Sequence, residues 1–334
     1  MRIAIIGSGA MGASFGARLA QAGADIILFD KDAGHIAAIR EKGLAVASPL
    51  GDVVLSLPAT TDPAEIGPVD MALVTVDGNA IKAAAALLVD ILPADAFALT
   101  LQNGIGNVEA LVEALGAARV MAGNTYNSGA RRGPGRVAHT NVGLTTMGEL
   151  DGSESERLKA VAGLFEAGGL PVALTDNVMG HVWSKFVLNV AINPVSAVTG
   201  LRSGEIARTP EALSLLEHVL DEALAVIAAK GIELPDADMR THVIDHTWVR
   251  YNRPSMLQHI ESGQRTEIDS LNGALVREAK ALGIPCPFNE AIVMVVKSLE
   301  ARARYRADSP EIDEAALEAA ARATPRPKRP HNRE

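Results

Sequence analysis

Three glycines near the N-terminus have the spacing of a phosphate-binding turn. Gly7, Gly9 and Gly12 form G-x-G-x-x-G between an apolar segment and a helix-forming one. In such a turn the first glycine permits a tight bend, the second lets the backbone approach a pyrophosphate, and the third lets the helix pack closely on the sheet. Asp30 ends the next apolar segment, near the roughly 20-residue spacing of a ribose-binding carboxylate. The pattern predicts a dinucleotide site; the alternative is a glycine-rich α/β turn without a ligand.

A second group of polar residues lies in the segment HVWSKFVLNVAINPVSA, residues 181–197. Lys185 and Asn189 are four residues apart and share one face of a helix, and Asn193 lies one turn further on. Unpaired polar groups are costly to bury, so these three side chains need polar partners within their apolar helix. The partners are either a ligand or polar groups at a domain interface.

The segment NRPSMLQHIESGQRTEIDSLNGALV, residues 252–276, also places Ser255, Glu267 and Asn272 among apolar residues. A helix is predicted to start near Glu267, where the helix dipole alone would favour a carboxylate. Asn103 follows a predicted buried strand, and ligands of open α/β sheets bind at the carboxyl ends of strands. The position of Asn103 therefore predicts contact with a nicotinamide or a substrate.

Strand-like and helix-like segments alternate from the N-terminus to residue 175. After the first strand–helix–strand unit, the predicted strands are Leu44–Ala47, Val53–Leu57, Val69–Val76, Ala96–Leu101, Val120–Tyr126, Arg136–His139, Leu144–Met147 and Pro171–Leu174. The predicted helices are Asp32–Lys42, Ala80–Leu92, Val108–Leu115 and Glu154–Ala167. This alternation predicts an α/β fold, a Rossmann domain with a doubly wound parallel sheet over residues 1–175.

The pattern changes at about Asp176, after which no strand-like segment occurs up to Tyr305. The predicted helices are Asn177–Val198, Pro210–Lys230, Asp236–Val249, Ser255–Ser262, Glu267–Leu282 and Asn289–Arg304. We expect an all-helical substrate and catalytic domain over residues 176–308, then a short helix and a disordered basic tail over 309–334. Pro210–Lys230 is apolar over a wide face, which suits a buried core or a subunit interface.

The bulk composition excludes several classes of protein. The net charge of −9 argues against a nucleic-acid or anionic-membrane surface. No apolar run reaches the roughly 18 residues that a membrane span needs, and the N-terminus is itself a strand of the nucleotide fold rather than a signal peptide. Cys286 is the sole cysteine, which excludes an intramolecular disulfide and a cysteine metal cluster. We therefore expect a cytoplasmic protein without a metal site.

In combination these motifs resemble the ketopantoate reductase (2-dehydropantoate 2-reductase) family. The resemblance rests on GxGxxG, LQNGIGN, HVWSKFVLNVAINP, RPSMLQ and RTEIDSLNG, whose order and spacing match from residue 1 to about 305. It implies a Rossmann domain and a helical domain with the active site between them. It also implies reduction of a 2-oxo acid by hydride from a nicotinamide cofactor.

The resemblance assigns roles to individual residues. It implies that Lys185 is the general acid that protonates the alkoxide, and that Glu267 orients the lysine and a substrate hydroxyl. The implied substrate-binding residues are Asn103, Asn189, Asn193, Asn252 and Ser255. The implied cofactor-binding residues are Gly7, Ser8, Gly9, Ala10, Met11, Gly12, Asp30, Lys31 and Asn103.

Some positions depart from the family pattern. Asp77 stands where a lysine is usual after the fourth strand, and His259 stands where an aspartate is common. Both departures favour a substrate specificity that is altered from the family pattern. The family is usually NADPH-dependent, and Lys31 could bind a 2′-phosphate. Asp30 would instead accept hydrogen bonds from a free ribose 2′-OH and repel a phosphate, so NAD is the preferred prediction and NADP the alternative.

The leading hypothesis is a 2-oxo acid reductase that acts on ketopantoate or a similar small acid. One alternative is an NAD-dependent D-2-hydroxyacid dehydrogenase of the same superfamily that acts on another bulky 2-oxo acid. A further enzymatic alternative is a β-hydroxyacid or hydroxyacyl dehydrogenase, which also pairs a Rossmann domain with a helical domain but lacks the R-x-T-E-I-D-x-x-N-G segment. A non-catalytic dinucleotide sensor would have no use for Lys185 as a buried proton donor. The expected partners are a small-molecule substrate and a second copy of the chain.

Overall fold

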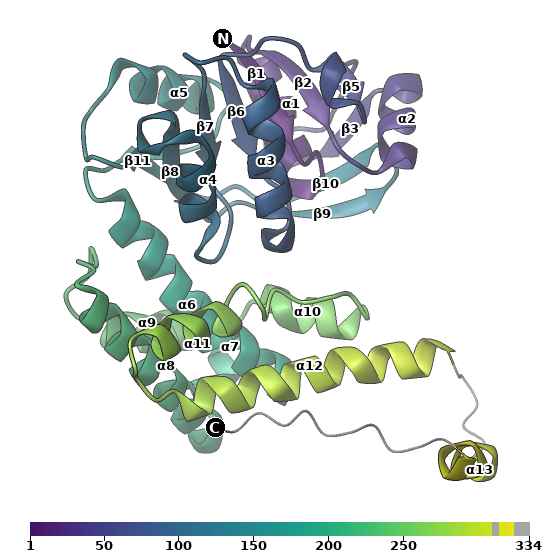
Figure 1. Cartoon of the computed structure of the whole chain (residues 1–334), viewed down its shortest axis with the longest axis vertical. Helices are drawn as coiled ribbons and strands as arrows, with labels where there is room; N and C mark the ends of the chain where they lie inside the picture. The colour runs from purple at the N-terminus through teal and green to yellow at the C-terminus, as the bar shows by residue number, and fades with distance from the viewer. Residues whose placement is uncertain (309–313, 324–334) are drawn as a thin grey trace.

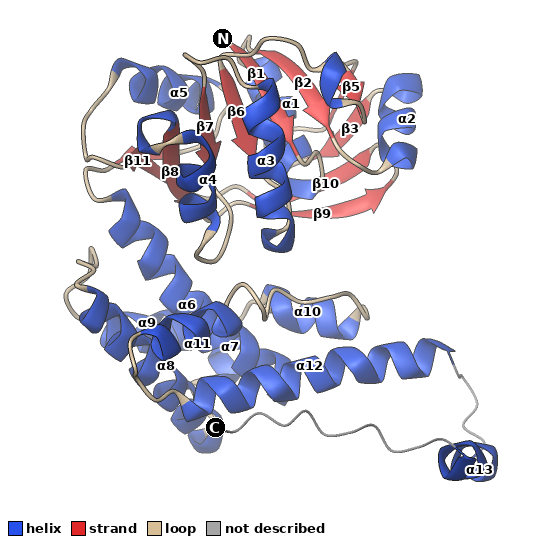
Figure 2. Cartoon of the chain, in the orientation of Figure 1, coloured by secondary structure: helices blue, strands red, loops and turns tan. Residues whose placement is uncertain are grey.

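The structure is a computed structural model that describes residues 1–308 and 314–323 (Figure 1). An α/β part contains every strand of the described residues, and a helical part follows it (Figure 2). Helix α6, Val178–Thr199, runs from the edge of the α/β part into the helical part. The basic tail was predicted at the end of the 309–334 segment, and residues 324–334 lie outside the described residues.

The main sheet has eight strands in the order β12-β11-β8-β7-β6-β1-β2-β5. The strands are β1 Arg2–Ile6, β2 Asp25–Phe29, β5 Ala59–Thr60, β6 Met71–Val74, β7 Phe97–Thr100, β8 Val120–Thr125, β11 Thr145–Glu149 and β12 Val172–Leu174. The six strands from β8 to β5 run parallel to one another. The predicted Rossmann sheet is confirmed.

One pair of strands makes this sheet mixed. Strand β11 runs antiparallel to β8, while β12 is parallel to β11. Between β8 and β11 the chain forms a hairpin, β9 Ser128–Gly133 and β10 Arg136–Asn141, instead of a crossover helix. Without that crossover the chain returns in the opposite direction, because parallel neighbours need a long connection.

The hairpin completes a second sheet of four strands in the order β4-β3-β10-β9. Strand β3, Leu44–Ala47, has the predicted bounds, whereas β4, Val53–Leu55, ends two residues earlier than predicted. Strand β9 was not predicted, because its sequence, SGARRG, is polar and contains two glycines.

Helices cover both faces of the main sheet. Helices α1 Ala10–Gln21 and α5 Glu156–Ala167 pack on one face, where the Phe15 and Phe165 rings lie 5.6 Å apart. Helices α3 Ile81–Ile91 and α4 Asn107–Leu115 cover the other face and lie in front of the strands in Figure 1. Helix α2, Ala33–Lys42, and the short 3-10 helices Pro63–Glu65, Gly78–Ala80 and Ala117–Arg119 complete this part.

The helical part is built around α6, which is buried along most of its length. Its other helices are α7 Ser203–Ile206, α8 Pro210–Lys230, α9 Met239–Val249, α10 Ser255–Glu261, α11 Asn272–Ala281, α12 Pro287–Asp308 and α13 Glu314–Ala323. Helix α8 has the predicted bounds and packs against α6 and α12, so its apolar face belongs to the core of the subunit.

Two predictions about this part were wrong in detail. The helix predicted from Glu267 begins at Asn272, because residues 267–271 form a turn in which the Glu267 carbonyl accepts the N–H groups of Ser270 and Leu271. The helix predicted from Asp236 begins at Met239, where the side chain of Asp238 caps it. No helix of the described residues is long and apolar enough to cross a membrane.

Candidate active site

The glycine turn has the geometry that its three glycines predict. Gly7 has φ of +95°, and a Cβ there would lie 2.8 Å from the backbone nitrogen of Val76. A Cβ on Gly12 would lie 2.1 Å from the Gly7 carbonyl oxygen, so this glycine lets α1 approach the turn. A Cβ on Gly9 would meet no atom within 4 Å, because this glycine faces open space.

Helix α1 begins directly after Gly9 without a side-chain cap. Its first N–H groups are therefore available to an anion, and the positive end of the helix dipole favours a phosphate there. The Thr75 hydroxyl donates to the Gly7 carbonyl oxygen at 2.8 Å and holds the turn against the end of β6. The turn therefore fits the pyrophosphate of a dinucleotide.

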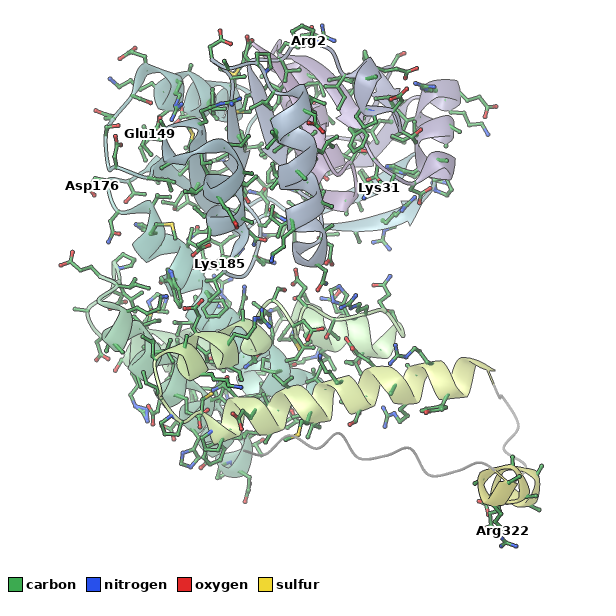
Figure 3. The ribbon with its side chains drawn as sticks, in the orientation of Figure 1. Arg2, Lys31, Glu149, Asp176, Lys185 and Arg322 are labelled. Carbon is green, nitrogen blue, oxygen red and sulfur yellow. The ribbon has the colours of Figure 1, made fainter. Side chains whose placement is uncertain are left out.

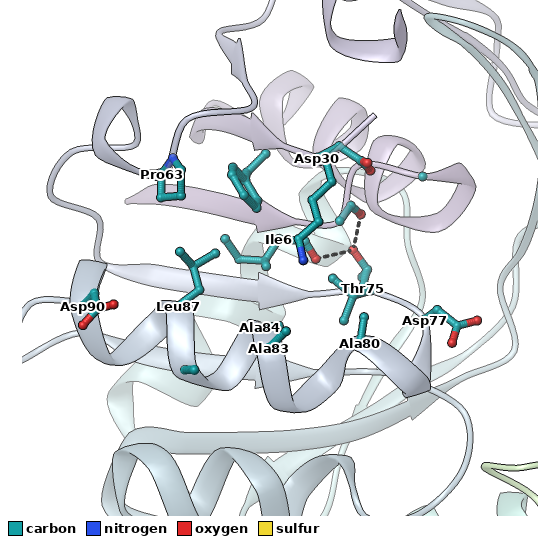
Figure 4. Close-up of a pocket in the computed structure, with 16 residues that line it drawn as sticks. Ile6, Asp30, Pro63, Thr75, Asp77, Ala80, Ala83, Ala84, Leu87 and Asp90 are labelled. Carbon is teal, nitrogen blue, oxygen red and sulfur yellow. Dashed lines mark hydrogen bonds between the residues drawn. The ribbon is translucent and has the colours of Figure 1, made fainter. Parts of the chain in front are cut away.

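A cavity of about 500 Å³ extends from this turn along α3 (Figure 4). Gly7, Gly9, Asp30 and Lys31 line one side, and the small side chains of α3 line the other. The Asp30 carboxylate accepts the backbone N–H of Asp32 at 3.0 Å. Arg131 of β9 pairs with Asp32 at 2.7 Å, so the carboxylate of Asp32 already holds this guanidinium. Asp30 and Lys31, which were predicted to lie at the ribose of the cofactor, therefore both line the cavity.

A second cavity of about 130 Å³ lies where the α/β and helical parts meet. It shares Thr75 and Val76 with the first cavity, so the two adjoin at the carboxyl end of β6. Its lining combines strand ends of the sheet with two charged side chains of the helical part, Lys185 and Glu267. Figure 3 shows Lys185 between the two parts.

Lys185 reaches from α6 to two oxygens of the α/β part. Its Nζ donates to Asn103 Oδ1 at 2.6 Å and to the backbone carbonyl oxygen of Thr125. The ring of Tyr126 lies 5.6 Å from the same nitrogen. Asn103 also lowers the pKa of the Glu267 carboxyl group, so it lies close to both the lysine and the glutamate.

Burial shifts each pKa in the direction that favours the neutral form of the side chain, down for Lys185 and up for Glu267. Desolvation lowers the pKa of Lys185 to about 8, and the nearby Glu267 offsets part of that fall. Desolvation raises the pKa of Glu267; His259, Lys185 and the bond from Asn103 oppose the rise, while Asp77 adds to it. Lys185 is therefore mainly protonated at pH 7 and can release a proton more readily than an exposed lysine.

The structure brings together only some of the predicted residues. Lys185, Glu267 and Asn103 line the second cavity, whereas Asn189, Asn193, Asn252 and Ser255 do not. Asn189 and Asn193 continue the Lys185 face of α6 at four-residue intervals, and Ser255 begins α10. The Asn252 side-chain oxygen accepts the Ser203 hydroxyl at 3.3 Å, which ties it to α7.

The two residues that depart from the family pattern lie close to Glu267, since both affect its pKa. Asp77 accepts the backbone and side-chain N–H groups of Asn79, at 2.8 and 2.6 Å, and lines the first cavity. His259 has a buried Nδ1 with no hydrogen-bond partner among the described residues. Near Glu267 the site therefore has other residue types than the family pattern at two positions, Asp77 and His259.

The sequence analysis missed two residues at the end of β8 and just beyond it, Thr125 and Asn127. Thr125 supplies a carbonyl oxygen to Lys185, and Asn127 lines the same cavity. Asn127 donates to the Thr125 hydroxyl at 2.7 Å, and its side-chain oxygen accepts from Nε2 of His139 at 2.8 Å. The acceptor at Thr125 is a backbone oxygen, which every residue type has, so the sequence could not indicate it. Asn127 could have been found from its position, because it follows an apolar strand as Asn103 does.

Two family profiles match the chain. The profile described as ketopantoate reductase PanE/ApbA matches residues 3–152, and the profile of its C-terminal part matches residues 177–300. The curated 2-dehydropantoate 2-reductases of Pyrococcus abyssi and Pyrococcus horikoshii are 32% and 33% identical to the chain. Each alignment covers 90% of this chain and 98% of the relative.

Solved structures are also similar to this chain over most of its length. A PanE/ApbA family ketopantoate reductase from Ralstonia eutropha is 33% identical with a TM-score of 0.83, covering 91% of this chain and 100% of its own. The ternary structure of D-mandelate dehydrogenase with NADH and anilino(oxo)acetate is 27% identical with a TM-score of 0.82, at the same coverage. The chain belongs to the ketopantoate reductase family.

Proposed function

As this chain is a member of the ketopantoate reductase family, we propose that it reduces the keto group of 2-dehydropantoate, or of a similar bulky 2-oxo acid, to the 2-hydroxy acid. The observation that carries the proposal is the position of Lys185 in the cavity next to the dinucleotide site. A nicotinamide cofactor supplies the hydride that adds to the carbonyl carbon.

Lys185 supplies the proton that completes the reduction. An ammonium has three N–H groups, and Asn103 Oδ1 and the Thr125 carbonyl oxygen accept two of them. The third can donate to the keto oxygen of the substrate and polarise its carbonyl. When negative charge develops on that oxygen, the proton passes from Nζ to it, and the neutral amine still donates to both acceptors. A pKa of about 8 suits this transfer better than the usual 10.5.

Glu267 and Asn103 position the lysine. Asn103 accepts from Lys185 through its side-chain oxygen, and its amide lowers the pKa of the Glu267 carboxyl group. Glu267 also favours the charged form of Lys185 before the reaction. We propose that Asn189, Asn193, Asn252 and Ser255 contact the substrate from the helical part, as the family pattern implies.

We propose NADH rather than NADPH as the preferred cofactor. Asp30 lies at the cavity edge with a carboxylate that can accept a ribose 2′-OH and would repel a 2′-phosphate. Lys31 also lines the cavity, whereas Arg131 does not line it and is paired with Asp32. The D-mandelate dehydrogenase that resembles this chain was solved with NADH.

A second candidate is an NADH-dependent D-2-hydroxyacid dehydrogenase that acts on another bulky 2-oxo acid. The carboxylate of Asp77 beside Glu267 favours it, because the family pattern has a lysine at this position. Under either candidate we propose that the chain acts as a cytoplasmic homodimer.

The test is a panel of 2-oxo acids that includes 2-dehydropantoate, benzoylformate and 2-oxobutyrate, with nicotinamide absorbance as the readout. Reduction of 2-dehydropantoate with the highest kcat/KM supports the first candidate, and a higher value for benzoylformate supports the second. If the chain binds NADH but reduces no acid, it is a dinucleotide sensor and the proposal is wrong.

A further inference from the structure

One aromatic side chain at the lysine site takes no part in the proton transfer. Tyr126 directly follows β8, and its ring centroid lies 5.6 Å from Nζ of Lys185. The residue is 43% exposed, as is Leu144, whose carbonyl oxygen accepts the Tyr126 N–H at 2.9 Å. The large side chain of Tyr126 therefore lies partly uncovered near the proposed proton donor, and the equally exposed Leu144 is its neighbour across the backbone hydrogen bond.

The backbone that carries this ring is held in place. The Tyr126 carbonyl oxygen accepts the side-chain N–H of Asn141 at 2.7 Å. Gly143 packs so closely that a Cβ there would lie 2.5 Å from the same oxygen. Tyr126 thus occupies a rigid position, as a residue that shapes a binding site requires.

The phenol is neutral at physiological pH. Burial raises the pKa of Tyr126, and Arg250 opposes the rise only in part. Arg250 follows α9 and belongs to the helical part, so the ring lies near both parts of the molecule. A neutral ring that is fixed and partly uncovered offers an apolar surface to a ligand.

We propose that Tyr126, together with Leu144, receives the group attached to the carbonyl carbon of the substrate and selects 2-oxo acids in which this group is bulky and apolar, branched or aromatic. The inference rests on the proposed function, because it needs the keto oxygen at Nζ of Lys185. A substituent on the adjacent carbonyl carbon then lies within a few bond lengths of the Tyr126 ring. A small substituent would leave the ring and Leu144 in contact with water.

The experiment compares wild type with Tyr126→Ala and Tyr126→Phe on two bulky acids, benzoylformate and 2-dehydropantoate, and one small acid, 2-oxobutyrate. We expect Tyr126→Ala to lower kcat/KM for the bulky acids by about 10- to 100-fold and for 2-oxobutyrate by less than about threefold. Tyr126→Phe keeps the apolar ring and should behave as wild type. Tyr305→Ala is the matched control, since Tyr305 lies on α12 and is 78% exposed.

Two results would overturn the inference while leaving the proposed function intact. An equal loss of kcat/KM on all three acids would mean that Tyr126 acts only through Lys185. A shift in the pH at which kcat/KM of Tyr126→Ala falls would lead to the same conclusion. Unchanged kcat/KM on the bulky acids, or a wild-type preference for 2-oxobutyrate, would place the substituent elsewhere. Wild-type inactivity on every acid would instead contradict the proposed function and this inference together.

Discussion

The phosphate turn and the lysine site adjoin at Thr75 and Val76, yet they are built in opposite ways. The turn is made of backbone and takes its shape from glycines that are close together in the sequence. The lysine site is made of side chains and one carbonyl oxygen from four distant segments, at Asn103, Thr125, Lys185 and Glu267. A site of the first kind depends on steric fit, and one of the second kind depends on charge and burial.

Removing the lysine gives the largest expected effect and tests the contrast most directly. Lys185→Ala should lower kcat by about 10³-fold or more, because both the proton donor and the charge at the developing alkoxide are lost. NADH affinity, measured by fluorescence titration, should stay within about threefold, since the turn is a separate structure. Lys82→Ala, an exposed lysine on α3, is the control. Normal turnover of Lys185→Ala would remove this residue from the mechanism.

The pH profile tests whether burial controls the chemistry of the lysine site. Lys185 has a pKa lowered to about 8, so it is charged below that pH and neutral above it. The kcat/KM for reduction should therefore be constant below pH 8 and fall about tenfold per unit above it. For oxidation of the hydroxy acid, which needs the neutral amine, kcat/KM should rise up to the same pH. A reduction rate that is unchanged up to pH 10 would contradict this assignment.

Two glycine substitutions test whether the turn depends on steric fit. In Gly12→Ala the new Cβ would lie 2.1 Å from a backbone oxygen, which should lower the free energy of unfolding by about 1–3 kcal/mol. In Gly9→Ala the Cβ meets no atom of the protein, so stability should change by less than about 0.5 kcal/mol. Gly9→Ala should still weaken NADH binding, because the methyl group occupies the approach to the pyrophosphate. Denaturant unfolding and NADH titration of both variants measure these effects, and equal stability losses would contradict the contrast.

The smallest expected effect concerns the charges of Asp30 and Lys31, which line the cavity next to the phosphate turn. Asp30→Ser removes the carboxylate that would repel a 2′-phosphate, so the ratio of kcat/KM for NADPH to that for NADH should rise by about tenfold. Lys31→Ala should change this ratio in the opposite direction. If wild type already prefers NADPH strongly, Lys31 outweighs Asp30 and the proposed preference is wrong.

The fold could be predicted to a large extent from the sequence. Long periodic segments such as α8 have the predicted bounds, and β1, β6 and β7 were visible as apolar runs. Strand β9 was not predicted because its sequence is polar and contains two glycines, and the turn at Glu267 was not predicted because a contact distant in the sequence stabilises it. Strand β9 pairs with β10, and Thr266 next to Glu267 donates twice to Glu300 of α12, at 2.6 and 2.7 Å.

The sequence by itself determined the phosphate turn, since a glycine pattern of six residues specifies backbone geometry locally. It also supplied Lys185, Glu267 and Asn103 as candidates through their family motifs. Only the tertiary structure decided how these three meet, that the Thr125 carbonyl oxygen accepts from the lysine, and that the Tyr126 ring lies beside it. The physical reason is that a pKa is set by burial and by neighbouring charges, and residues far apart in the sequence become neighbours only when the chain folds.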